Sequence, residues 1–72
     1  MEKYSNRNGN SSVTYYQIED TSITVWFKGS TRSYTYSYQK AGSYHVENMK
    51  RLAVSGLGLS AYITRNVKYL YD

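Results

Sequence analysis

The chain has 72 residues, a net charge of +4 and no cysteine, which predicts one small domain without a disulfide framework. Its first residues are polar and no apolar run is long enough to span a bilayer, so we expect neither a signal peptide nor a membrane segment. These features favour a cytoplasmic protein. Ten tyrosines are the outlier in composition, and a tyrosine can line a core, stack on a base or anchor a protein partner.

Residues 1–11 are rich in Asn, Ser and charge, so we expect a flexible tail ahead of a single domain over residues 12–72. Three segments rich in β-forming residues follow, over 12–18, 22–28 and 31–38. The second and third alternate apolar and polar side chains, as half-buried strands do. Turn residues separate the segments, which predicts a three-stranded antiparallel meander.

The strand register follows from matching the apolar faces across short loops. Directly opposed residues share a face, and a shift by one residue would mix apolar and polar side chains. The predicted partners on the apolar face are Tyr16 with Val25, Ile18 with Ile23, Val25 with Tyr34, and Ile23 with Tyr36. The same register places Tyr15 opposite Trp26 on the other face.

Apolar residues recur at helical spacing between 46 and 53, which predicts an amphipathic helix of about three turns covering the apolar sheet face. Ser43 is its expected N-cap and Gly56 its expected end. A short second helix capped by Ser60 should follow, with residues 67–71 as a strand or extended arm. The predicted fold class is therefore α+β, with the meander followed by one amphipathic helix and a short second helix packed on one sheet face.

The order of these elements resembles the KTSC domain family. The residues that carry the resemblance are Tyr16, Ile23-x-Val25-x-Phe27, Gly29, Tyr34-x-Tyr36, Ser55-Gly56, Leu59 and Ile63. It covers roughly residues 12–71, while residues 38–44 depart from the family's stretch before the helix. The family comprises small bacterial and phage domains, alone or fused to larger proteins including some lysyl-tRNA synthetases. The resemblance implies the same fold, a bacterial cytoplasm or a host cytoplasm if phage-encoded, and no established activity.

No catalytic or metal-binding pattern is present in the sequence. The five carboxylates form no paired spacing, and His45 and Glu47 are two residues apart, so a helix would point them to different sides. His45 is interpreted as a solvent-facing residue of the first helical turn. The glycines at 56 and 58 match no dinucleotide or P-loop spacing and are interpreted as a helix end. We therefore expect a protein that is not an enzyme and uses neither a cofactor nor a metal.

The candidate binding residues are aromatic and basic. Tyr15 and Trp26 should share the uncovered sheet face with Thr35, near Lys28 and Arg32, and a second basic group lies in the C-terminal half. The full candidate set is Tyr15, Trp26, Lys28, Arg32, Thr35, Lys50, Arg51, Arg65 and Lys68. A solvated charged surface is the alternative interpretation of the four basic residues from 50 onwards.

Four interpretations of the aromatic pair stay open: a stacking platform for nucleic acid, a protein–protein patch, a homodimer seam, and a Trp26 covered by the C-terminal tail. The favoured function is a small non-catalytic binding domain that acts through protein–protein interaction as an adaptor or inhibitor, for example a phage product directed against a host enzyme or defence complex. The alternative is binding of single-stranded RNA or DNA through the aromatic face and the basic residues. A monomer and a homodimer are both compatible with the sequence.

Overall fold

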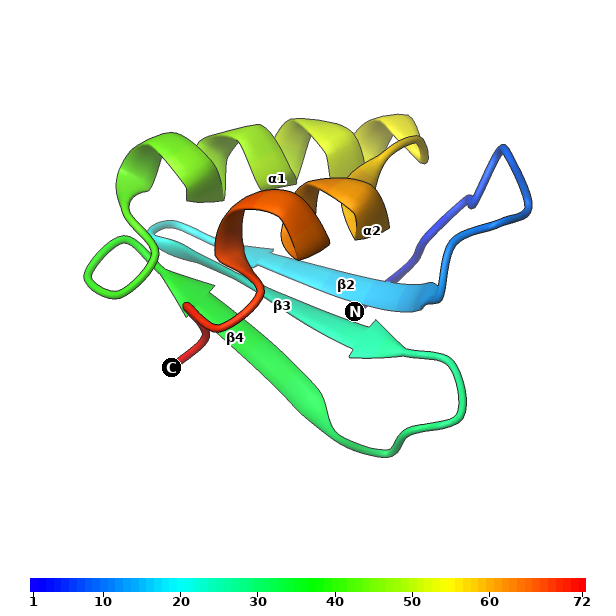
Figure 1. Cartoon of the computed structure of the whole chain (residues 1–72), viewed down its shortest axis with the longest axis horizontal. Coiled ribbons are helices and arrows are strands. Elements are labelled where there is room, and N and C mark those ends of the chain that lie inside the picture. Colours follow the sequence, from blue (N-terminus) through cyan, green and yellow to red (C-terminus); the bar gives the residue numbers. More distant parts are fainter.

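The computed structural model describes all 72 residues as an α+β fold. Four antiparallel strands form one sheet in chain order: β1 (Glu2–Lys3), β2 (Val13–Glu19), β3 (Ser22–Phe27) and β4 (Ser33–Ser37). Three helical elements follow: α1 (Ser43–Ser55), α2 (Leu59–Tyr62) and the π-helical turn η1 (Ile63–Val67) that continues α2. Figure 1 shows them all on one side of the sheet, so the opposite sheet face has no covering element. No helix has the length and apolarity that crossing a membrane requires.

The predicted register of the meander is confirmed. Tyr16 lies opposite Val25, and Ile23 lies opposite both Ile18 and Tyr36 in its two neighbouring strands. The loops differ from the prediction in length. The turn between β2 and β3 is tighter, because Glu19 and Ser22 still pair, whereas the loop between β3 and β4 extends over residues 28–32.

A bulge at Thr14 changes the phase of β2. Val13 lies opposite Phe27, but the next paired residue of β2 is the partner of Trp26, so Thr14 has no partner of its own. Its Oγ1 donates a hydrogen bond to the carbonyl oxygen of Trp26 at 3.1 Å. The extra residue allows both Val13 and Tyr16 to face the helices, although they are three positions apart.

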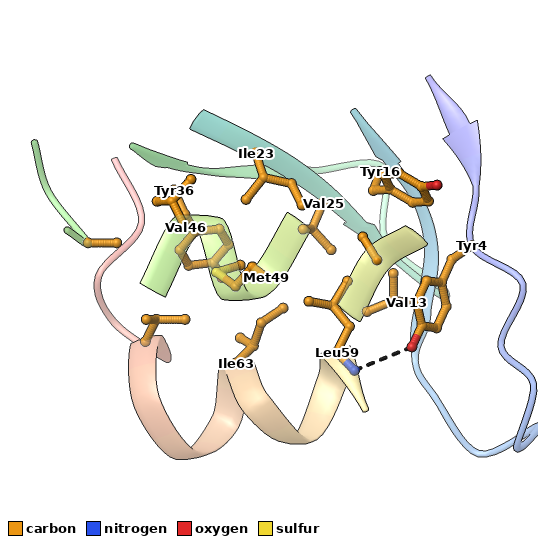
Figure 2. Packing of buried hydrophobic residues seen from close by; sticks show 13 residues of the cluster. Tyr4, Val13, Tyr16, Ile23, Val25, Tyr36, Val46, Met49, Leu59 and Ile63 are labelled. Atoms are coloured by element: carbon orange, nitrogen blue, oxygen red, sulfur yellow. Dashed lines mark hydrogen bonds between the residues drawn. The ribbon is translucent and has the colours of Figure 1, made fainter. Parts of the chain in front are cut away.

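The N-terminal segment differs from the predicted flexible tail and adds a fourth strand to the predicted three. Glu2 and Lys3 pair with β2, and the side chain of Tyr4 is 2% exposed. The Tyr4 hydroxyl accepts a hydrogen bond from the Leu59 N–H at 3.3 Å, which satisfies a free donor in the first turn of α2 (Figure 2). One buried ring within a polar run produces no periodic pattern, so the sequence did not predict this strand.

The core lies between the covered face of the sheet and the helices (Figure 2). It contains thirteen buried residues: Tyr4, Val13, Tyr16, Ile23, Val25, Tyr36, Ala41, Val46, Met49, Ala53, Leu59, Ile63 and Val67. Full burial of a large apolar side chain contributes about 1.5–3 kcal/mol relative to an exposed one. Residues from the N-terminal segment to η1 contribute to this core, so it holds the sheet and the helices together.

The ends of the helices follow the predictions only in part. Gly56 ends α1 in the left-handed conformation, with φ of 76°, as expected. Ser43 and Ser60 do not act as caps: α1 begins with Ser43 itself, and Ser60 lies inside α2. The last residues form neither a strand nor a free arm, because the Asp72 N–H donates to the Thr35 carbonyl at 2.7 Å.

Candidate binding surfaces

The open face is the sheet surface that points away from the helices. Its central row crosses all four strands, since Lys3 pairs with Tyr15, Tyr15 with Trp26, and Trp26 with Ser33. Tyr15 is 39% exposed and Trp26 is partly buried. The sequence predicted this aromatic pair, and the structure brings the two residues together as direct cross-strand partners.

The C-terminal segment does not cover Trp26. Tyr71 packs edge-on against Tyr34, with ring centroids 4.9 Å apart, and against Tyr36 at 6.4 Å. Both of those residues face the helices. The segment therefore closes the core side of the sheet and leaves the open face to solvent.

Hydroxyl groups surround the aromatic row. Tyr38 N–H donates to the Thr21 carbonyl, which fixes the alternation of β3 and β4 and makes Thr24–Thr35 a non-hydrogen-bonded pair with close side chains. Their Oγ1 atoms lie 2.8 Å apart. The surface beside Trp26 on the side of Thr24 and Thr35 is therefore polar and held in place by the strands.

The predicted basic residues lie in different places. Lys28 continues the alternation of β3 on the open face, and its N–H donates to the Ser12 carbonyl at 2.7 Å. The guanidinium carbon of Arg32 instead lies 5.4 Å from the ring centroid of Tyr34, which faces the helical side. Arg32 and Trp26 therefore belong to opposite sides of the sheet.

The four candidate basic residues from position 50 onwards form no shared contact. Lys50 bonds the Asp20 carbonyl at 2.9 Å, and Arg51 bonds the side chain of Asn48. Arg65 is exposed on η1, and the ammonium group of Lys68 lies 5.5 Å from the ring centroid of Tyr69. The ammonium group of Lys50, a residue of α1, thus reaches the turn between β2 and β3, while Lys68 lies just beyond η1.

An ionic cluster joins α1 to the β2–β3 turn. Glu47 accepts hydrogen bonds from Tyr38 and from Lys50, whose ammonium nitrogen lies 2.8 Å away. The hydrogen bond from Lys50 lowers the pKa of Glu47, and the bond to Glu47 raises the pKa of Tyr38. Each bond favours the charge state already present at neutral pH, so the cluster is suited to fixing α1 on the sheet.

His45 differs from the predicted solvent-facing residue. It is half-buried, and its Nδ1 lies 2.6 Å from the hydroxyl oxygen of Tyr62, which also accepts a hydrogen bond from Asn48 at 3.2 Å. These bonds connect α1 to α2. No group of three His, Asp or Glu side chains is placed to hold a metal ion.

Comparison of the chain with family models, with curated proteins and with solved structures finds no match. The resemblance to the KTSC family therefore stays a prediction. Function has to be inferred from the geometry of the two sides of the sheet.

A second surface, which the sequence did not predict, is a groove of about 400 Å³ on the helical side. It runs between the β3–β4 hairpin and the segment after α2. We call it the tyrosine groove, and its aromatic lining residues are Phe27, Tyr34, Tyr36, Tyr69 and Tyr71. One predicted binding residue, Lys68, lines the groove, and a second, Arg32, lies over the ring of the lining residue Tyr34 without lining the groove itself. Among these tyrosines Tyr69 is 76% exposed.

Proposed function

We propose that this chain is a non-catalytic protein-binding domain that acts as an adaptor or inhibitor through the open face of its sheet. The observation that carries the proposal is the Tyr15–Trp26 pair at the centre of a sheet face that no other element covers. Tryptophan and tyrosine are the residues that most often dominate the binding energy of protein interfaces.

The surroundings of the pair suit a protein partner. Thr24, Thr35 and Ser33 supply a hydroxyl rim, and polar rims of this kind surround the buried centres of protein interfaces. Because Tyr15 and Trp26 lie on paired strands, little backbone freedom is lost when a partner docks. A partner protein would therefore meet a rigid aromatic centre with a polar border.

Single-stranded nucleic acid is the second candidate for the same face. Lys3 lies opposite Tyr15 in the central row, and Lys28 lies two residues beyond Trp26, so positive charge flanks the aromatic pair. A base stacked on an aromatic side chain contributes about 1–3 kcal/mol. The basic track is short, however, because Arg32 and Lys68 lie on the helical side.

The test compares capture of proteins from a bacterial lysate by three immobilised forms of the domain. We expect Trp26→Ala to lose the captured partner, since the side chain at the centre of the interface is removed. Tyr44→Ala is the matched control, because Tyr44 is an aromatic residue of α1 that is 75% exposed and lies away from the open face. It should capture the same partner as the unmodified domain.

Capture that is equal for the unmodified domain and Trp26→Ala would overturn the proposal. A parallel titration with oligonucleotides addresses the second candidate, because Trp26 is the only tryptophan and reports on its own surroundings. Quenching of its fluorescence that weakens steeply with added salt would favour nucleic acid over a protein partner.

A further inference from the structure

The tyrosine groove has an aromatic floor that is already ordered. Phe27 and Tyr34 pack edge to face with ring centroids 5.5 Å apart, and Tyr71 packs edge to face on Tyr34 at 4.9 Å. The three rings are partly buried, whereas Tyr69 at the rim is largely exposed. The groove thus offers a fixed apolar base and one free aromatic ring.

Positive charge and hydroxyl groups border this floor. Arg32 lies over Tyr34, and Lys68 lies beside Tyr69 as a lining residue. Ser30, Ser60 and Thr64 also line the groove, and no carboxylate does. No lining residue therefore neutralises the positive charge at the groove, which suits it to binding an anion.

The carboxylates of the chain gather elsewhere. Four of the five lie around the β2–β3 turn and the adjoining end of β4: Glu19, Asp20, Glu47 and Asp72. The 28–32 loop lies at the other end of the sheet (Figure 1). The carboxylates therefore lie away from the 28–32 loop and its Arg32, which would favour approach of an anion to the β3–β4 hairpin.

We propose that the tyrosine groove binds a nucleotide, free or as one unit of a single strand. The base would stack on the exposed ring of Tyr69, and the phosphate would pair with Arg32 and Lys68. Hydroxyl groups such as those of Ser60 and Thr64 are suited to the ribose. The volume of about 400 Å³ lies within the range of small-ligand sites. This site is separate from the open face and does not depend on the function proposed for that face.

The location is tested by NMR, with adenosine monophosphate added to the full 15N-labelled chain. We expect amide signals of Ser30, Thr64, Lys68 and Tyr69 to shift in a saturable manner at millimolar nucleotide. Signals of the open face around Thr24 should stay in place. Adenosine and inorganic phosphate, titrated separately, should each bind at least tenfold more weakly than the nucleotide, because each lacks one half of the contacts.

The contribution of charge is tested by substitution. Arg32→Gln and Lys68→Gln should each weaken nucleotide binding on the order of tenfold, since each removes a charged hydrogen bond to phosphate. Lys40→Gln is the matched control, because it removes the same charge from an exposed loop at the other end of β4. It should leave the affinity within about twofold. Unchanged spectra of the free variants would show that the fold is intact.

A further titration with a short oligothymidylate distinguishes a free nucleotide from one unit of a single strand. Binding at least tenfold tighter than that of the mononucleotide would identify a strand, and equal or weaker binding would identify a free nucleotide. The proposal is overturned if adenosine binds as well as its monophosphate, if the shifts map to the open face, if Lys40→Gln weakens binding as much as Lys68→Gln, or if millimolar nucleotide causes no shift.

Discussion

The two faces of strand β3 have different surroundings. On the covered face, Ile23 and Val25 are fully buried against the helices. On the open face, Thr24 and Trp26 are only partly buried, and no helix covers the sheet from that side (Figure 1). The period-two alternation of a strand lets a domain of this size use one set of residues for folding and the neighbouring set for recognition. Stability and binding are therefore expected to respond to different substitutions within the same six-residue strand.

The largest effect on stability is expected for Ile23→Ala. Truncation of a fully buried isoleucine leaves a cavity and costs about 2–5 kcal/mol, a large part of the stability of a small domain. Urea unfolding followed by circular dichroism measures this loss. Thr24→Ala, on the other face of the same strand, loses a hydroxyl pair rather than core packing and should cost about 0.5–1.5 kcal/mol. If the two variants lose the same free energy of unfolding, the covered face does not stabilise the fold more than the open face does.

A smaller effect is expected at Gly56, where the N-terminal segment meets the covered side. An alanine there would adopt φ near 76°, and its Cβ would lie 2.7 Å from the Cβ of Ser5. We expect Gly56→Ala to cost about 1–3 kcal/mol for the backbone strain, and more for the displaced segment. Gly29→Ala separates the two causes, because Gly29 has a similar φ of 78° but nothing within 4 Å. If both variants lose the same stability in urea, the contact with Ser5 has no energetic role.

The hydrogen bond between Thr24 and Thr35 allows a finer test of the open face. Either single replacement by valine removes the bond and leaves a hydroxyl without its partner, so each should cost about 0.5–1.5 kcal/mol. The double replacement should be less costly than the sum of the two, because no unpaired hydroxyl then remains. Urea unfolding of the four forms gives the coupling energy. Additive losses would mean that the hydroxyl pair does not stabilise the sheet.

At neutral pH the smallest effect is expected for Tyr36→Phe. Burial raises the pKa of Tyr36 to about 12, with the neighbouring Tyr34 and Tyr71 adding to the shift, so the folded state retains the phenol proton. The stability that this provides is present below the ordinary tyrosine pKa of 10.0 and is lost as the pH rises toward 12. Unfolding by urea across this interval should show a weaker pH dependence for Tyr36→Phe. If the unmodified protein and Tyr36→Phe show the same pH dependence, a group other than Tyr36 causes it.

The register of the meander was predictable because two strands alternate with unambiguous apolar faces. The pairing of Tyr15 with Trp26 followed from that register alone. The N-terminal strand was not predictable, since its attachment depends on the single buried ring of Tyr4 within a run of polar residues. The bulge at Thr14 was also missed, because a one-residue change of phase leaves no mark in composition.

The candidate sites differ in the same way. The residues of the open face follow from the alternation of side chains along each strand, so they can be predicted from the sequence. The tyrosine groove forms only where α2, η1 and the segment after them meet the β3–β4 hairpin, and it brings together residues from Ser12 to Tyr71. Packing of distant segments decided which tyrosines became buried and which, like Tyr69, remained exposed. Periodicity within one segment carries no information about such a crossing.

The contact of Tyr4 with Leu59 has a consequence for synthesis of the chain. The two residues are separated by 55 positions, so the core cannot close until most of the protein has been made. Contacts of such long range slow folding, because the entropy of a large loop is lost before the stabilising contacts form. During translation the meander would emerge with its apolar face uncovered. Folding of this domain is therefore expected to follow release of its last third from the ribosome rather than to proceed strand by strand.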